Sequence, residues 1–264
     1  MTGGDGGEPD DREAALTRSL AAVRSRLAAA AAAAGRPVAD IEMLPVTKFF
    51  PASDVVILSR LGCRAVGESR DQEAAGKAAD VARLLRAAAE ASPHVDVPEP
   101  RWHMVGNIQR NKARSVARWA HTVHSVDSVR LATALDREAS AALADGHRAE
   151  PLRVYVEVSL DGDPSRGGVD IATPQAVDRV CEQVAGSASL ELLGLMSVPP
   201  LGWDPDEAFD RLQSEQRRVR ESYPGAVGLS AGMSNDFEVA VKHGSTCVRV
   251  GTALLGPRPL PSPY

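Results

Sequence analysis

The sequence predicts a single α/β domain, a (β/α)8 TIM barrel with an additional N-terminal helix. Short apolar runs alternate with longer segments of helical periodicity and give eight βα units in order, the number that closes a parallel barrel. No Pro/Gly-rich linker divides the series, and no GxGxxG motif connects a strand to a helix. An open, doubly wound sheet is therefore the less favoured alternative.

The two ends of the chain lie outside the predicted barrel. The acidic, Gly-rich segment 1–10 is expected to be a disordered tail, and the Pro-rich segment 258–264 is expected to be a second tail. Residues 11–257 between them form the barrel domain. Its first helix is predicted over 11–34, where leucines recur at helical spacing until Gly35 stops the pattern.

The predicted strands are short apolar runs, and the helices between them are longer segments of helical periodicity. The strands are 41–47, 64–67, 101–105, 121–124, 152–159, 190–196, 226–229 and 247–250. The helices are 52–61, 70–90, 109–118, 127–144, 173–186, 205–222 and 235–243.

The composition favours a small-molecule partner. The formal charge is -5, from 35 acidic and 30 basic side chains mixed along 264 residues, so no basic field exists to attract nucleic acid or anionic lipid. Cys63, Cys181 and Cys247 are widely separated and form no CxxC motif, which suggests a reducing compartment. Neither a signal peptide nor a membrane-spanning run is visible. We expect a cytoplasmic monomer that binds neither nucleic acid nor membrane.

Functional residues of such barrels lie where strands end, and the first predicted strand delivers Lys48 in the stretch LPVTKFFP. Apolar neighbours such as Leu44 and Val46 would partly desolvate the amine, which disfavours the ammonium form and allows a Schiff base with an aldehyde. The alternative is a structural lysine that happens to follow a strand.

The loops after the seventh and eighth strands, SAGMSND and GTALLG, occupy the positions where barrels of this type often bind phosphate. Gly232 and Gly251 would allow close approach of backbone N–H groups, and Asn235 or Ser234 could cap the following helix. The alternative is that both loops only cap helices. The hydroxyls available to a phosphate are those of Ser230, Ser234 and Thr252.

Pyridoxal 5′-phosphate carries both an aldehyde and a phosphate, so it is the predicted cofactor. An aldolase acting on a phosphorylated sugar would also use these two features. Arg249 helps to separate the two hypotheses because it lies two residues before Gly251, on a strand whose inward side chains face the ligand. Met196, at the end of the sixth strand, and Met233, in the seventh loop, complete the predicted cofactor site; as core filler, Met196 would look the same.

The motifs VTKFFP, GESRDQEA, WHMVGNIQRNK, VHSVDS, GLMSVPP and GMSNDFEVAVKHGSTCVRVGTALLG, in this order, resemble the YggS/PROSC family of pyridoxal-phosphate homeostasis proteins. The resemblance extends from the N-terminal helix to Gly256. It implies a barrel like the N-terminal domain of alanine racemase, with the cofactor on Lys48. It also implies that Ser230 to Ser234 and Gly251 with Thr252 hold the phosphate, and that Arg249 lies by the pyridine nitrogen.

Three positions depart from the family pattern. Ser69 stands where an Asn is common, Ser159 ends the fifth strand in place of another Asn, and Arg166 stands where a Lys is usual. These changes leave the predicted cofactor core intact. They put in doubt any secondary contact, or second cofactor site, that the usual side chains would support.

The resemblance and the residue chemistry together favour a carrier over an enzyme. Pyridoxal phosphate is an effective electron sink when its ring nitrogen is protonated, and an arginine beside that nitrogen opposes protonation. Racemisation also needs a second base, which relatives of this fold type supply as a tyrosine from another domain. The three tyrosines of this chain do not suit that role (Tyr155, Tyr223 and Tyr264). We predict an intracellular carrier that supplies apo-enzymes, with a weak amino-acid racemase as the alternative.

Overall fold

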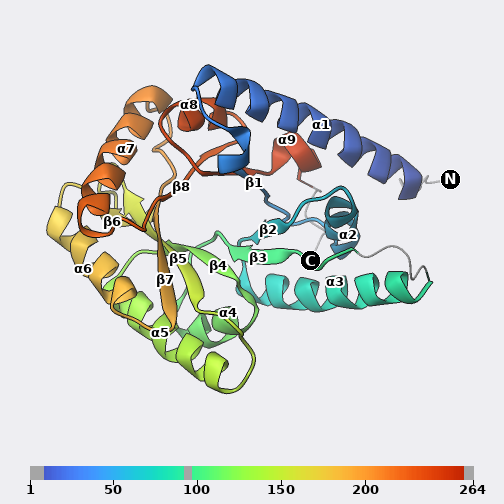
Figure 1. The fold of residues 1–264 in the computed structure, drawn as a ribbon, viewed down its shortest axis with the longest axis horizontal. Helices are drawn as coiled ribbons and strands as arrows, with labels where there is room; N and C mark the ends of the chain where they lie inside the picture. Colours follow the sequence, from blue (N-terminus) through green and yellow to red (C-terminus); the bar gives the residue numbers. More distant parts are fainter. Residues whose placement is uncertain (1–8, 92–96, 259–264) are drawn as a thin grey trace.

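The computed structural model describes residues 9–91 and 97–258, and it shows the predicted barrel (Figure 1). Eight parallel strands pair in the order β1-β9-β8-β7-β5-β4-β3-β2. The two ends of this order meet through a parallel bridge between Val46 and Gly67, where Thr47 N also donates to Gly67 O over 2.9 Å. The ring of strands is thereby closed. The doubly wound alternative is wrong.

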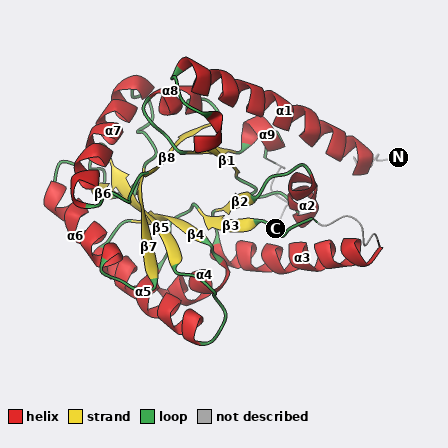
Figure 2. Ribbon diagram, in the orientation of Figure 1, coloured by secondary structure: helices red, strands yellow, loops and turns green. Residues whose placement is uncertain are grey.

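The strands are short, as expected for a barrel of this size, and the helices surround them (Figure 2). The strands are β1 Glu42–Pro45, β2 Ala65–Glu68, β3 Arg101–Met104, β4 Thr122–Val126, β5 Leu152–Ser159, β6 Val169–Asp170, β7 Leu190–Met196, β8 Gly228–Met233 and β9 Cys247–Val250. The helices are α1 Pro9–Ala33, η1 Val38–Asp40, α2 Ala52–Arg60, α3 Asp71–Ala91, η2 Arg110–Lys112, α4 Ala113–Trp119, α5 Val129–Ala144, α6 Pro174–Ala185, α7 Pro205–Ser222, α8 Phe237–Lys242 and α9 Thr252–Leu255.

The predicted bounds of β5, β7, β9 and α7 match the structure, and most others differ by one to three residues. Helix α1 begins at Pro9, inside the segment expected to be a tail. The predicted helix 109–118 is divided into η2 and α4. Three short elements, η1, β6 and α9, were not predicted, because segments of two to four residues carry no readable periodicity. The predicted tails at 1–8 and 259–264 lie outside the described residues.

The seventh strand was predicted to end at 229, but β8 runs to Met233. The register between β8 and β9 shifts between Ser230 and Met233, which is a bulge-like irregularity. Gly232 has a φ of 90°, so the chain bends there and pairing resumes beyond it. Most of the predicted phosphate loop therefore lies within the strand.

Helix α1 covers one side of the barrel, where it lies along α8 and α9 (Figure 1). Its leucines, Leu16, Leu20 and Leu27, are almost fully buried against Val248 and Val250 of the last strand. Arg12 also binds the Asp54 carboxylate of α2 through Nε, over 3.1 Å. These contacts make α1 part of the domain. No helix in the described part of the chain is long and apolar enough to cross a membrane.

Candidate functional site

Lys48 follows β1 at the carboxyl end of the barrel, beside the turn that follows β9. Strand β1 pairs with β9 in parallel, with Pro45 opposite Val250, and Val46 N donates to Val250 O over 2.9 Å. A Cβ built on Gly251 would lie 3.7 Å from Val46 O. The pairing of β1 with β9 therefore places Val46, two residues before Lys48, against the predicted phosphate turn at Gly251.

The environment of Lys48 favours a neutral amine. Burial lowers the pKa of Lys48, Arg258 and Arg70 lower it further, and Glu68 opposes them. Phe49, the only non-glycine residue with positive φ in the described chain, has a φ of 70°. Lys48 Nζ lies 6.0 Å from the centre of the Phe49 ring, and the guanidinium carbons of Arg70 and Arg258 lie 5.5 and 5.2 Å from it.

A buried ion pair lies next to Lys48. Glu68, at the end of β2, is fully buried, and its Oε1 accepts from Thr47 Oγ1 and from Lys77 Nζ, each over 2.6 Å. Lys77 Nζ also donates to Thr47 O over 2.9 Å. Glu68 Oε2 is buried and has no hydrogen-bond partner within the described residues. This carboxylate is therefore held by one of its two oxygens.

The turns after β8 and β9 are tied together by backbone and hydroxyl groups. Ala253 N donates to Ser234 Oγ over 3.3 Å, and Met233 N donates to Asp236 Oδ1 over 2.6 Å. A Cβ on Gly232 would lie 2.6 Å from Ala240 Cβ, so only glycine fits. The predicted cap was wrong: Asp236 is the N-cap of α8 and makes no capping bond to the helix.

Arg249 crosses the inside of the barrel near its carboxyl end. It is 6% exposed, Nη1 donates to Ser230 O over 2.8 Å and to Ser230 Oγ over 2.6 Å, and Nη2 donates to Ser197 O over 2.9 Å. Its position is thus set by Ser230 within β8 and by Ser197 directly after β7. The Ser230 hydroxyl also bonds His124, so it belongs to an interior network in addition to its predicted role.

The other predicted residues sit around the same rim. Met196 is the last residue of β7 and is 2% exposed, whereas Met233, at the end of β8, is 39% exposed. Thr252 is exposed and begins α9, next to Gly251. The structure therefore gathers all predicted site residues at one end of the barrel. Which of them touch a ligand stays a prediction.

Glu157 of β5 is a carboxyl group whose properties the sequence did not reveal. Burial raises the pKa of Glu157 to about 7, and Asp127 raises it as well, while Arg249 and Arg166 oppose the rise. The sequence analysis also did not identify Glu68 and Lys77 as a buried ion pair at the site. The buried strand-end position of Glu68, directly after an apolar run, was the one signal that could have identified it.

Two of the departures from the family pattern have clear structural roles. Ser159 Oγ donates to Asp161 Oδ1 over 2.9 Å. Arg166 Nη1 donates to Asp161 Oδ2 over 3.1 Å, and its Nη2 donates to Val198 O and Pro199 O over 2.9 and 2.8 Å. Together they connect the loops after β5 and β7.

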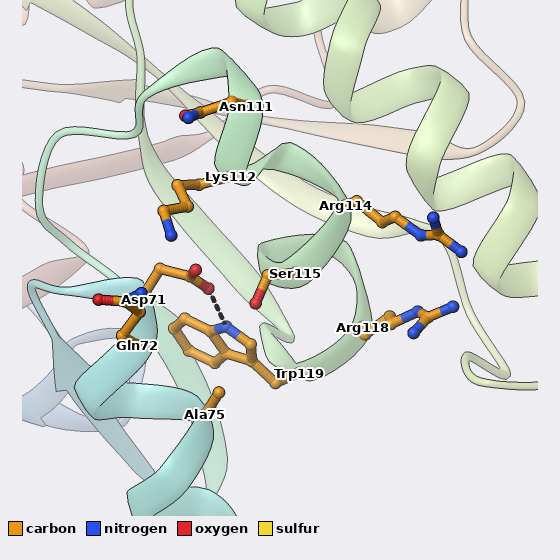
Figure 3. Close-up of a pocket in the computed structure, with 9 residues that line it drawn as sticks. All are labelled: Asp71, Gln72, Ala75, Asn111, Lys112, Arg114, Ser115, Arg118 and Trp119. Atoms are coloured by element: carbon orange, nitrogen blue, oxygen red, sulfur yellow. Dashed lines mark hydrogen bonds between the residues drawn. The ribbon is translucent and has the colours of Figure 1, made fainter.

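A cavity of about 690 Å³ lies outside the barrel, between α3 and α4 (Figure 3). The Trp119 indole N–H donates to Asp71 Oδ1 over 2.9 Å, and Arg114 and Arg118 point away from the indole. None of the predicted cofactor residues lines this cavity. It is separate from the candidate site.

The residues at the mouth fit a phosphorylated aldehyde. Lys48, whose pKa is lowered, follows β1, the strand that pairs with β9 and leads to the Gly251 turn. Gly232 keeps the β8 backbone free of a side chain. A phosphate needs backbone N–H groups and hydroxyls, which the two turns supply.

Comparison with known proteins supports this assignment. The family model of the alanine racemase N-terminal domain matches residues 19–259. The chain is 72% identical over 253 residues to the pyridoxal phosphate homeostasis protein of Mycobacterium tuberculosis (strain CDC 1551 / Oshkosh), covering 96% of both chains. Its counterpart from Corynebacterium glutamicum is 43% identical over 226 residues, covering 85% of this chain and 94% of that one.

Solved structures with a similar fold include a PLP-bound protein and an alanine racemase. PipY of Synechococcus elongatus PCC7942, with PLP bound, has a TM-score of 0.73 and 29% identity, covering 91% of this chain and 100% of PipY. Alanine racemase from Corynebacterium glutamicum shares the fold, with a TM-score of 0.61 and 16% identity, covering 96% of this chain and 63% of the racemase. The chain belongs to the family of pyridoxal phosphate homeostasis proteins.

Proposed function

We propose that the chain binds pyridoxal 5′-phosphate as a reversible Schiff base on Lys48 and acts in cofactor homeostasis without strong catalysis. The observation that carries the proposal is the position of Lys48, a partly buried amine beside the turn after β9. PipY, whose structure contains PLP, and relatives named for pyridoxal phosphate homeostasis support the choice of ligand.

Comparison of the four lysines also favours Lys48. Lys77 Nζ is held by Glu68, and Lys242 Nζ is held by Asp206, over 2.6 and 2.8 Å. Lys112 lines the cavity outside the barrel. Lys48 is thus the lysine at the mouth whose amine is not committed to a carboxylate within the described residues.

The surrounding residues would hold the cofactor without strongly activating it. Bound pyridoxal phosphate supplies an electron sink, which is effective when its ring nitrogen is protonated. Arg249 is a donor at this end of the barrel and cannot accept that proton. Tyr155 lines a cavity at the opposite end, and Tyr223 closes α7, so neither supports a role as second base.

We further propose that the protein acts in the cytoplasm as a monomer and passes the cofactor to apo-enzymes. Reversibility follows from the chemistry of an imine, which exchanges with other amines and with water. A weak racemase remains the second candidate, because the chain shares the family model of the alanine racemase N-terminal domain.

The test is borohydride reduction of the cofactor-loaded protein, followed by peptide mass mapping. We expect the reduced adduct on Lys48 and its loss in Lys48→Ala, with Lys112→Ala as the matched control that keeps it. An adduct on another lysine, or retention in Lys48→Ala, would refute the proposal. Sustained racemisation of L-alanine above the rate of free cofactor would favour the racemase.

A further inference from the structure

Glu157 is a carboxyl group on the inner wall of the barrel, near its carboxyl end. Successive side chains of a strand point to opposite faces, and Val156 and Val158 of β5 pack in the core between the strands and the helices. Glu157 therefore points into the barrel, as Tyr155 does. The ring centres of Tyr155 and His124 lie 4.6 Å apart, and His124 bonds across the interior to β8.

The strand register places Glu157 in one row with predicted cofactor residues. Glu157 of β5 pairs with Met196 of β7, and Met196 pairs with Ser230 of β8. Residues paired in this way in a parallel sheet point to the same face. Ser230 Oγ in turn accepts from Arg249 Nη1 over 2.6 Å. Glu157 thus lies in the same layer of the interior as three residues of the predicted site.

This row ends on the wall that faces Lys48. In the closed ring of eight strands, β5 is four places from β1, in the order β1-β9-β8-β7-β5. The interior of an eight-stranded barrel is just wide enough for side chains or for one small ligand. A ligand anchored by Lys48 and by the turns after β8 and β9 would therefore have Glu157 on the opposite wall.

The carboxyl of Glu157 is accessible and is held by no partner. It is half-buried, makes no hydrogen bond or ion pair in the described part of the chain, and its oxygens retain accessible surface. The charged groups that act on it are Asp127 after β4, Arg249 of β9 and Arg166 in the loop after β5; β7 and β8 add no charge to the row. Burial and Asp127 raise the pKa of Glu157 and the two arginines oppose the rise, which leaves the pKa at about 7.

We propose that Glu157 forms the wall of the cofactor site opposite Lys48 and takes up a proton from solvent when the cofactor binds. The inference rests on the proposed function. The phosphate of the cofactor adds negative charge to the mouth, and a nearby negative charge disfavours an ionised carboxyl. A protonated carboxyl also offers an O–H donor to the ligand, whereas the carboxylate offers none.

The affinity for the cofactor should therefore depend on pH in one direction. An anionic ligand raises the pKa of Glu157 above about 7, so the complex binds more protons than the free protein. Affinity is then highest below pH 7 and falls as pH rises through the two pKa values. A rise of one pKa unit on binding corresponds to a loss of about tenfold.

The test uses the full-length protein and 4-deoxypyridoxine 5′-phosphate, which keeps the ring and the phosphate but has no aldehyde to react with a lysine. Isothermal titration calorimetry in two buffers of different ionisation enthalpy counts the protons taken up on binding. At pH 7.5 we expect the wild type to take up about half a proton more than Glu157→Gln. Between pH 6 and pH 9 its affinity should fall about tenfold more than that of the variant.

Glu191→Gln, at the amino end of the neighbouring strand β7, is the matched control and should behave as the wild type. Equal proton uptake by the wild type and Glu157→Gln would overturn the inference, as would an equal change in Glu191→Gln. The result is independent of the bond to Lys48. A Glu157-dependent uptake that persists in Lys48→Ala supports the inference even if borohydride fixes no adduct on Lys48, whereas an adduct without that uptake would sink the inference alone.

Discussion

The two ends of the barrel use the same kinds of side chain in opposite ways. At the carboxyl end, the pair Glu68 and Lys77 is buried, with side-chain exposures of 0% and 11%. At the amino end, Arg153 and Glu191 form a pair with side-chain exposures of 35% and 52%. A buried pair is costly to break because one charge is left without solvent, whereas an exposed pair contributes little.

The glycines Gly232 and Gly225, one at each end, differ in the space available for a Cβ. The carboxyl end contains Gly232, which no larger residue can replace without a clash, and Phe49 at positive φ. At the amino end, Gly225 has open space around its Cβ position. A Cβ on Gly228, which lines the amino-end cavity, would lie 2.8 Å from Leu193 O, so the amino end contains both an open and a tight glycine position.

The largest expected contrast comes from breaking one ion pair at each end. Lys77→Met leaves the buried Glu68 carboxylate without its positively charged partner, so we expect the free energy of unfolding to fall by about 3 to 5 kcal/mol. Arg153→Met should lower it by less than about 1 kcal/mol. Urea denaturation of both variants measures the difference. Equal losses would remove the basis of the comparison.

The second contrast concerns glycine. Gly232→Ala places a Cβ 2.6 Å from that of Ala240, in a backbone conformation that alanine rarely adopts. We expect a loss of about 1 to 3 kcal/mol in unfolding free energy and weaker cofactor binding. Gly225→Ala, at the amino end, should be neutral or slightly stabilising. Thermal unfolding and cofactor titration test both variants, and a neutral Gly232→Ala would contradict the packing argument.

The third contrast is pH-dependent. The folded-state pKa of Glu157 is about 7, above its ordinary value of 4.5, so folding favours the protonated form and stability is lost as pH rises from about 4.5 to 7. Glu157→Gln removes this loss.

We expect Glu157→Gln to raise the unfolding free energy at pH 9 by about 1 to 3 kcal/mol, with the gain vanishing near pH 4.5. Glu191→Gln, at the amino end, should give no gain at either pH. Denaturation at several pH values provides the measurement. A gain from Glu157→Gln that does not change with pH would disprove the titration of this carboxyl.

The smallest expected effect is on the pKa of the Lys48 amine. Arg258 lowers the pKa of Lys48, so Arg258→Gln should raise it and slow cofactor capture at neutral pH by a factor of about two to five. The effect should shrink in 1 M salt if it is electrostatic. Arg101→Gln is the matched control at the other end. Stopped-flow absorbance measures the rates, and an equal slowing by both variants would argue against a local effect.

The position of Lys48, Gly232, Gly251 and Thr252 at one end of the barrel was predictable because parallel strands all end on the same side. The hydrogen bonds that connect His103 to His124 and His124 to Ser230 were not predictable. The sequence does not show which residues these side chains meet, because the partners lie far apart along the chain. His124 is 21 residues from His103, and Ser230 is 106 residues from His124.

The sequence by itself determined the number of βα units and their order, because periodicity and turn residues are local properties. Only the tertiary structure decided that Glu68 meets Lys77, that Arg249 bonds Ser230 of β8 and Ser197 after β7, and that His103 meets His124 inside the barrel. These contacts depend on register and barrel closure, which are set by all strands together.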